Sequence, residues 1–192
     1  MHVDVARLLR NGITLRFTII VVALEQKAML LAIEFGFVFF TTCAAVTDYR
    51  QMRIPNWISI ALCALFAAYA LRYLPWPAIG WHAAVGGGVF AVGILSYAAG
   101  LFGAGDVKLL GALALWAGPE QIVEFLVLIG LLGGAFGLLI LAVRKLNHFF
   151  PAYVERPSEV WNITRWAHSG KCPYGIPIAV AALVSIPRVF LA

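Results

Sequence analysis

The sequence predicts an all-α fold, a polytopic membrane helix bundle of about six transmembrane helices. Hydrophobic residues make up 62% of the 192 residues, and the mean hydropathy is +0.92. Only 12% of the residues are charged, and these lie between long apolar runs. Helices and closed barrels are the structures that satisfy their backbone hydrogen bonds in lipid. Because the alternating ten-residue segments of a barrel do not appear, we expect helices.

Six apolar segments form the predicted spans. They are residues 29–47, 56–74, 82–102, 106–118, 121–143 and 174–190. At 1.5 Å per residue the first measures about 28 Å, close to the ~30 Å of a hydrocarbon core. The fourth measures only about 20 Å. We therefore expect the fourth span to begin below the membrane surface, beside a water-filled pocket where lipid tolerates irregular backbone.

Local features support several of these spans in turn. The first ends at Asp48, and the second follows a short basic loop that closes with Pro55. Three consecutive glycines lie near the start of the third span, and overlapping GxxxG pairs lie in the fifth. Small residues of this kind allow close helix packing in lipid. We expect them to serve packing within the chain rather than self-association, and the oligomeric state stays open.

Lysine and arginine set the predicted orientation. If the loop 48–55 faces the cytoplasm, the segments on that side carry eight basic residues, and the outer segments after the first span carry two. The eight are Arg50, Arg53, Lys108, Arg144, Lys145, Arg156, Arg165 and Lys171, and the two are Arg72 and Arg188. This asymmetry follows the positive-inside rule. It also explains the net charge of +5 without binding to nucleic acid.

Residues 1–28 do not fit this orientation. Their four basic residues would all lie outside, and the apolar run 12–24 is short and contains Arg16. Such a run is more typical of an interfacial segment than of a seventh span. We therefore divide the chain into an arm, residues 1–28, and a six-helix membrane domain, residues 29–192. Either the natural chain begins at Met29 or the arm is a dispensable, non-essential extension.

Several kinds of site are not indicated by the sequence. The three cysteines form no CxxC pair, so neither a disulfide framework nor a zinc site is expected. The histidines lack the HExxH spacing of a metallopeptidase. The GxSxG motif of many serine hydrolases does not occur either. We expect no metal and no cofactor.

Two aspartates lie where spans meet the predicted cytoplasmic surface. Asp48 follows the first span and Asp106 opens the fourth. Carboxylates at such a boundary are costly unless they are paired, hydrated or used. Two neighbouring carboxyl groups can share one proton, which gives one group to activate water and one to protonate a leaving group. Without a catalytic role, Asp48 would be an ordinary loop residue and Asp106 an ordinary helix N-cap, and the residues alone are consistent with this alternative as well.

Glycines stand beside the second aspartate. We expect Gly103 and Gly105 to form irregular backbone that a substrate can approach closely, because glycine takes conformations barred to other residues. Asp106 would then cap the fourth helix, with Lys108 nearby.

Two segments resemble the aspartate motifs of the type IV prepilin peptidase family. Residues 47–56, TDYRQMRIPN, are similar to the first motif, in which an Asp precedes a basic loop and Ile-Pro-Asn. Residues 103–110, GAGDVKLL, are similar to the GxGD motif. The resemblance covers about residues 29–192. It implies a membrane aspartic endopeptidase of the bacterial inner membrane that removes the short basic leader from prepilins at the cytoplasmic face, with Asp48 and Asp106 as its catalytic pair.

The chain departs from the larger members of that family. Those members carry a cysteine-containing insert between the first two spans that is associated with N-methylation, whereas about eight residues without cysteine join the spans here. Methyltransferase activity is therefore not expected. The short form is similar to the peptidases of tight-adherence (Flp) pilus systems. Short members also look similar around Tyr174 and Gly175, where Gly175 either admits a substrate backbone or only starts a helix.

The remaining expectations concern partners. The implied partners are prepilin or pseudopilin substrates and membrane lipid. The loop 144–171 is rich in aromatic and charged residues, which is typical of a segment at the membrane surface. We expect it to anchor the protein at that surface rather than to guide substrates. Two alternatives remain: a small transport protein that uses Asp48, Asp106 and Glu34, and an inactive assembly partner. Transport is weakened by the lack of an inverted repeat, and the presence of both aspartates disfavours the inactive form.

Overall fold

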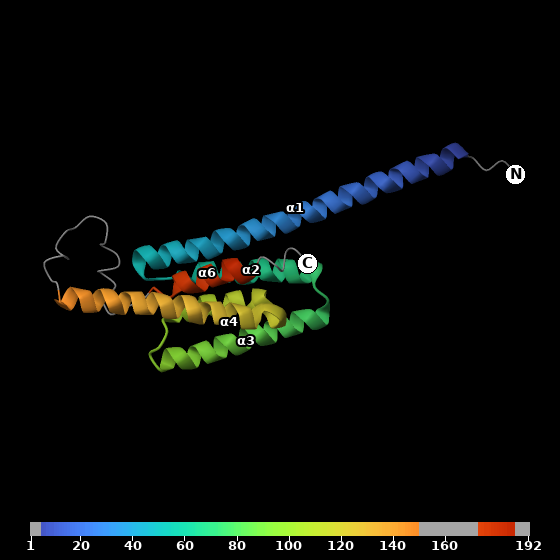
Figure 1. The fold of residues 1–192 in the computed structure, drawn as a ribbon. Helices are drawn as coiled ribbons and strands as arrows, with labels where there is room; N and C mark the ends of the chain where they lie inside the picture. The colour runs from blue at the N-terminus through green and yellow to red at the C-terminus, as the bar shows by residue number, and fades with distance from the viewer. Residues whose placement is uncertain (1–4, 150–172, 187–192) are drawn as a thin grey trace.

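The computed structural model describes the backbone of residues 5–149 and 173–186, and the side chains of residues 18–143, 145 and 173–186. All regular elements within these ranges are helices (Figure 1). They are α1 (Val5–Gln51), α2 (Asn56–Tyr73), α3 (Trp76–Ala98), α4 (Ala104–Phe149) and α6 (Gly175–Ser185). The predicted all-α membrane bundle is confirmed.

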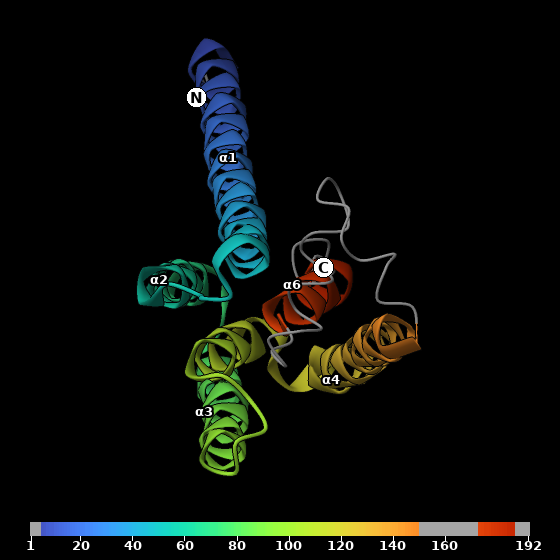
Figure 2. The ribbon, with the colours of Figure 1, turned by 90° about the vertical axis from the view of Figure 1, so that its left-hand side faces the viewer.

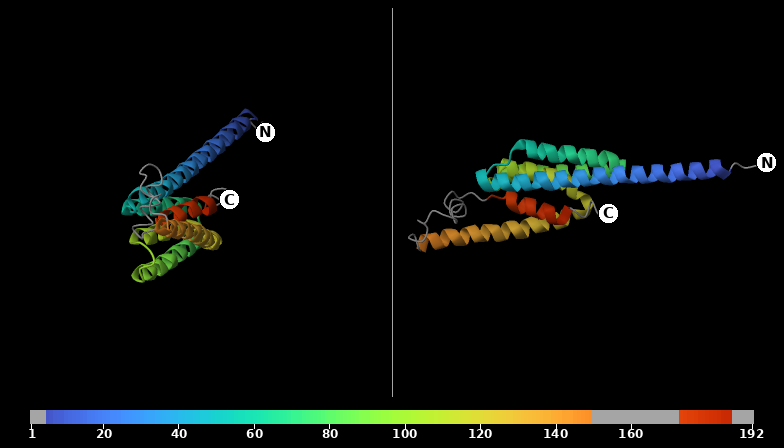
Figure 3. Two further views of the ribbon diagram at one scale, coloured as in Figure 1. Left: turned by 60° about the vertical axis from the view of Figure 1, so that its left-hand side comes forward. Right: turned by 90° about the horizontal axis from the view of Figure 1, so that it is seen from above.

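The described helices account for the six predicted spans. Four of them are long and apolar enough to cross a membrane, and α6 is a shorter apolar helix. Helix α4 contains two predicted spans, because the backbone is not helical at Gly118, where φ is 57° and ψ is −171°. The two halves of α4 run back beside each other (Figures 1 and 3). The predicted separation of the fourth and fifth spans is therefore visible as a reversal within one long element.

Helix α1 differs most from the prediction. The first span was expected to begin at Met29, yet the helix runs unbroken from Val5 to Gln51, and its first part projects beyond the other helices (Figure 1). The physical reason is the lack of a stop signal, since no proline precedes Pro55 and the glycines of the segment are isolated. Whether residues 1–28 lie at a membrane interface stays a prediction.

Other boundaries shift by a few residues. Helix α3 begins at Trp76 rather than at residue 82, because Pro75 stands at its N-cap and Pro77 in its first turn, where proline fits a helix start. Helix α4 continues to Phe149, so the first residues of the predicted loop 144–171 are helical. The rest of that loop lies outside the described residues, as do residues 187–190 of the sixth span.

The core centres on Trp116 in the first half of α4. Its indole N–H donates to the carbonyl oxygen of Leu62 in α2, at 3.1 Å, so the buried donor is satisfied. Its ring lies 5.0 Å from that of Phe37 in α1, 5.5 Å from Phe66 and 5.7 Å from Tyr69. This aromatic cluster joins α1, α2 and α4 in the core of the described bundle.

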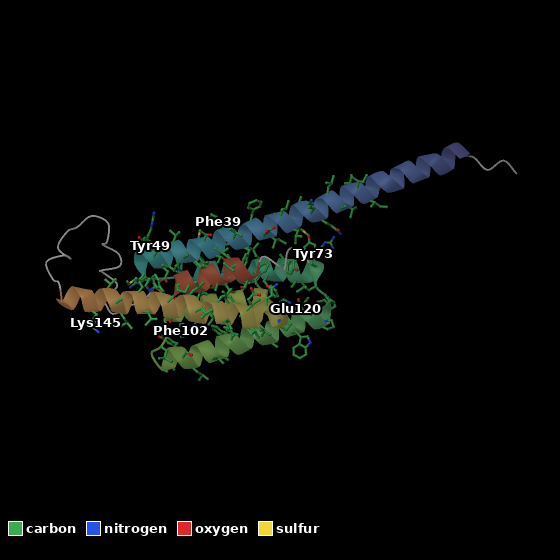
Figure 4. All side chains as sticks on the ribbon, viewed as in Figure 1. Phe39, Tyr49, Tyr73, Phe102, Glu120 and Lys145 are labelled. Atoms are coloured by element: carbon green, nitrogen blue, oxygen red, sulfur yellow. The ribbon has the colours of Figure 1, made fainter. Side chains whose placement is uncertain are left out.

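Helix α6 completes the bundle. Figure 2, which views the helices nearly end-on, shows α6 between α1 and the second half of α4. The two ends of the bundle are distinguished in Figure 4, where Tyr49 and Phe102 lie towards one end and Tyr73 and Glu120 lie at the other. The end that carries Tyr49 and Phe102 also holds the C-terminus of α1 and the N-termini of α4 and α6.

Candidate active site

Asp48 and Asp106 line one cavity of about 790 Å³ at this end of the bundle. Asp48 lies three residues before the end of α1, and Asp106 is the third residue of α4. Their carboxyl groups are close enough to interact electrostatically. Asp48 is 4% exposed, and Asp106 is half-buried. The structure therefore brings together the two aspartates that the sequence singled out.

Asp48 is held by the start of α6. The backbone N–H of Gly175 donates to Oδ2 of Asp48 at 2.8 Å, in a buried position. The first N–H groups of a helix have no partner within the helix, so they favour a carboxylate close to the helix N-terminus. A Cβ atom on Gly175 would lie 2.8 Å from the same carboxylate oxygen and 2.8 Å from Cδ1 of Ile54. Gly175 therefore both starts α6 and makes room for Asp48.

Asp106 is held by its own segment. The backbone N–H of Gly103 donates to Oδ2 of Asp106 at 3.2 Å. Asp106 was expected to be the cap residue itself, but Gly103 precedes the helix and Asp106 stands at the third helical position. Its side chain reaches back to the residue before the helix, which is the second half of a capping box. The same bond aims the carboxyl group at the start of α4, next to the cavity.

The two glycines of this segment act through packing. They were expected to adopt conformations that other residues avoid, yet the described glycines with positive φ are Gly100 and Gly118. A Cβ atom on Gly103 would lie 2.9 Å from Oδ2 of Asp106, and one on Gly105 would lie 3.2 Å from Cβ of Ile54. Gly105 is also inside the first turn of α4, so irregular backbone ends at Gly103. Both glycines permit close approach within the protein.

Two short loops supply the rest of the cavity wall. These are the α1–α2 connection with its neighbours, residues 51–56, and the end of the α3–α4 connection with the first two residues of α4, residues 100–105. The wall is therefore mixed, with polar groups beside apolar ones. Ile54 is the contributor that sequence reasoning missed, since it packs against both Gly105 and Gly175. Ile54 could have been found from the sequence, because it belongs to the Ile-Pro-Asn segment of the first aspartate motif.

Lys108 and Tyr174 stand beside the cavity and are not among its lining residues. The Nζ of exposed Lys108 donates to Oδ1 of Asn56 at 2.9 Å, which ties the start of α4 to the start of α2. The ring of Tyr174 meets that of Phe102 edge-on, with centroids 5.2 Å apart, and packs on Gly133. Of the five supporting residues expected from the sequence, Gly103 and Gly175 hold the aspartates directly, whereas Lys108 and Tyr174 support the surrounding structure.

Among the residues whose side chains the structure describes, no three His, Cys, Asp or Glu side chains gather into a group that could hold a metal ion. The cavity contains two carboxyl groups, of which Asp48 is the more buried and Asp106 the more exposed. One is fixed by a helix N-terminus and the other by a preceding backbone N–H. Such a pair can accept and donate protons towards a bound molecule.

Comparison with known proteins gives one match. A family model described as the type IV leader peptidase family matches residues 35–138, just over half of the chain, and this range contains both aspartates. No curated protein and no solved structure matches the chain. The matched range ends before α6, so the contact between Gly175 and Asp48 lies partly beyond it.

Proposed function

Because the chain belongs to the type IV leader peptidase family, a family of peptidases, we propose that it is a membrane aspartic endopeptidase with Asp48 and Asp106 as its catalytic pair. In this proposal it removes the leader peptide from prepilin-like substrates at the cytoplasmic face of a bacterial inner membrane. The observation that carries the proposal is the shared cavity, into which α1 and α4 bring two carboxyl groups at the same end of the bundle.

The proposed reaction uses the two groups in opposite protonation states. Two adjacent carboxyl groups repel each other when both are ionised, so the pair retains one proton. The ionised group accepts a proton from a water molecule, whose oxygen forms a bond to the carbonyl carbon of the scissile peptide. The protonated group donates its proton to the carbonyl oxygen. The C–N bond then breaks as the proton taken from water passes to the departing amine nitrogen. One hydroxyl of the intermediate returns its proton to the carboxylate that donated at the start, so the C=O bond re-forms and the pair again holds one proton.

The cavity is suited to an extended peptide. Its walls come from two segments, residues 51–56 and 100–105, which both lie between Asp48 and Asp106 in the sequence. Arg53 lies in the first loop and is exposed. The α1–α2 connection consists of residues 52–55 alone, which is shorter still than the sequence suggested. We propose peptidase activity without N-methylation, and substrates of the Flp type, on the likeness to the short members of the family.

The test is cleavage by purified protein in detergent. A prepilin that carries its leader is incubated with the protein, and loss of the leader is followed by mass spectrometry. Asp48→Asn and Asp106→Asn are each expected to lower kcat by at least about 10² to 10⁴, the usual contribution of general acid–base catalysis. Asparagine keeps the shape of the side chain but cannot exchange the proton.

Glu34→Gln is the matched control. Glu34 is an acid of the same helix α1, fourteen residues before Asp48, which places it about 21 Å away along the axis. This variant should cleave as the unmodified protein does. Retained cleavage in either Asn variant would reject the assignment of the pair. Equal losses in all three variants would point to general destabilisation instead of lost catalysis.

A further inference from the structure

Met52, the residue that follows α1, has an unusual backbone conformation. Its φ is 51°, and it is the one residue other than glycine with a positive φ among those whose backbone the structure describes. Many helices end with a residue in this left-handed region, but that residue is usually glycine, because a Cβ atom makes the conformation costly. A different residue stays there only where its surroundings hold it.

The side chain of Met52 belongs to a small apolar cluster. It is half-buried and packs on buried Ile140, as do Phe136, Val143 and Ile176. These five side chains, here called the Met52 cluster, come from the end of α1, the second half of α4 and the start of α6. Figure 2 shows α6 between the other two helices. Burial of apolar surface in the cluster therefore opposes the cost of the backbone conformation.

Both partners of the bond between Asp48 and Gly175 adjoin the Met52 cluster. On the side of α1, the N–H of Met52 donates to the carbonyl oxygen of Asp48 at 2.8 Å. On the side of α6, Ile176 directly follows Gly175, whose N–H donates to Oδ2 of Asp48 at 2.8 Å. The cluster thus packs the end of α1 against the start of α6 where this bond forms.

The start of α6 depends on such contacts for its position. Residues 150–174 connect it to α4, and a connection of this length does not by itself determine where the next helix begins. The ring contact of Tyr174 with Phe102 joins this start to the α3–α4 connection. The Met52 cluster joins it to the helix that carries Asp48.

We infer that Met52 is a positioning residue, which holds the start of α6 on Asp48 and thereby keeps the carboxyl group in one orientation. Its catalytic consequence rests on the function proposed above, whereas the contact itself rests on the geometry. Met52 touches the aspartate cavity, but it acts on the reaction through Asp48. A methionine remains at a position that suits glycine because glycine has no side chain to place in the cluster.

Three replacements of Met52 separate the side chain from the backbone. Met52→Gly removes the side chain and the backbone strain together, whereas Met52→Ala removes the side chain and keeps the strain, so the alanine variant should unfold at the lower temperature. In leader cleavage both should lose kcat alike, by about tenfold, with KM within about twofold. Met52→Leu preserves the apolar volume and should retain kcat.

The other side of the contact supplies a second variant and its control. Ile140→Ala removes the surface on which Met52 packs, so it should lower kcat in the same way. Leu139, the preceding residue of α4, is 47% exposed and lies outside the cluster. Leu139→Ala should therefore cleave as the unmodified protein does. The double variant Met52→Ala, Ile140→Ala should lose little more than either single variant, because each removes the same contact.

The amide of Gly175 gives a readout that does not depend on cleavage. Glycine follows tyrosine only at Tyr174-Gly175 in the sequence, so labelling with ¹³C-carbonyl tyrosine and ¹⁵N-glycine selects a single amide resonance of the protein in detergent. Asp48→Ala gives the position of this resonance without the carboxylate. In Met52→Gly and Met52→Ala the resonance should move towards that position, and in Met52→Leu it should stay.

The outcomes separate this inference from the catalytic assignment. If the unmodified protein leaves a prepilin uncut, the proposed function fails, and the resonance alone decides whether Met52 holds the contact. If the protein cleaves and the resonance stays in place in both Met52→Gly and Met52→Ala, the inference alone is overturned. A loss of kcat that follows the unfolding temperature, large in Met52→Ala and absent in Met52→Gly, would show a structural role only and would also overturn it.

Discussion

Asp48 receives its hydrogen bond from a residue 127 positions away in the chain, the backbone N–H of Gly175. A side chain at the end of a long helix has several rotamers, and a catalytic group must be held in one. The contact does this with a main-chain donor, which has little freedom of its own. The small size of Gly175 is then as important as its N–H, because any Cβ would occupy the space of the carboxylate.

Replacement of Gly175 by alanine should therefore impair cleavage more than folding. The added Cβ would lie 2.8 Å from Oδ2 of Asp48, so the carboxyl group or the start of α6 must shift. A misplacement of about 1 Å can cost about 10² in rate, and we expect a loss of that order in kcat. The measurement is leader cleavage together with thermal unfolding. Gly130→Ala is the control, because a Cβ there meets nothing within 4 Å; unchanged kcat in Gly175→Ala would contradict the positioning role.

The site could be predicted from the sequence only in part. Asp48 and Asp106 were identifiable because each stands at the end of an apolar span on the same predicted side. The role of Gly105 was misjudged, since its partner Ile54 belongs to another loop and local sequence does not show which surfaces meet. The donor to Asp48 was likewise unpredictable, because Gly175 could equally have been an ordinary helix start.

At the scale of the helices, the reversal of α4 at Gly118 places the two halves of this element beside each other in the bundle. Gly118 has φ 57° and ψ −171°, a combination that essentially only glycine adopts. The imidazole of His82 covers this glycine, and its Nδ1–H donates to the carbonyl oxygen of Leu115 at 2.7 Å. The same ring packs on Phe66 of α2. His82 of α3 thus packs on the reversal and holds it in place. The reversal ends the first half of α4 at Gly118.

Gly118→Ala should destabilise the protein. The backbone strain of an alanine at this φ and ψ costs about 1–3 kcal/mol, and the new Cβ would also collide with the His82 ring. We expect a lower midpoint of thermal unfolding in detergent. His82→Ala removes the collision but also the bond to Leu115 and the packing on Phe66. In that background only the backbone strain of Gly118→Ala remains, so the double variant should still unfold earlier than His82→Ala alone.

Gly134→Ala is the comparison for that experiment. It lies in the helical second half of α4, and a Cβ there meets nothing within 4 Å. Alanine is the better helix former, so this variant should unfold no earlier than the unmodified protein. If Gly118→Ala were equally neutral, the reversal would not depend on the special backbone conformation.

The helix boundaries show what sequence patterns can and cannot determine. Pro55 and the Gly118-Pro119 pair marked real ends, because both residue types act on the backbone locally. The start of α1 was not marked, since a helix can extend beyond the membrane wherever nothing stops it. The predicted short fourth span is supported by a helix that begins at Ala104, only two residues before Asp106.

At the scale of the whole molecule, the long α1 separates into a packed and a projecting part. The described side chains of residues 18–28 are all exposed. The hydroxyl of Tyr73 in the bundle donates to the carbonyl oxygen of Gln26 in this part, at 3.0 Å. Since this bond is exposed, its contribution belongs at the low end of about 0.5–1.5 kcal/mol. Residues 18–28 thus contribute little packing to the bundle.

A chain that consists of residues 29–192 should therefore insert and cleave normally. The side chains of residues 18–28 are exposed, so their removal uncovers no buried core, and the Tyr73–Gln26 bond that is lost is weak. We therefore expect kcat/KM within about twofold. Membrane fractionation and the leader-cleavage assay measure the two properties. Tyr73→Phe in the full chain loses only the bond to Gln26 and is the matched comparison. A shortened chain that stays out of the membrane would show that the projecting part is needed for insertion.

The contact between Asp48 and Gly175 also has a consequence for biosynthesis. A ribosome adds about 5–20 residues per second, so the 127 residues that separate the two partners take about 6 to 25 s to make. Throughout this interval the nascent protein lacks the amide that orients Asp48, although Asp106 is added well before the interval ends. If Asp48 acts as proposed, hydrolytic competence arrives with the last described helix, because an incompletely translated chain left in the membrane lacks a correctly held Asp48.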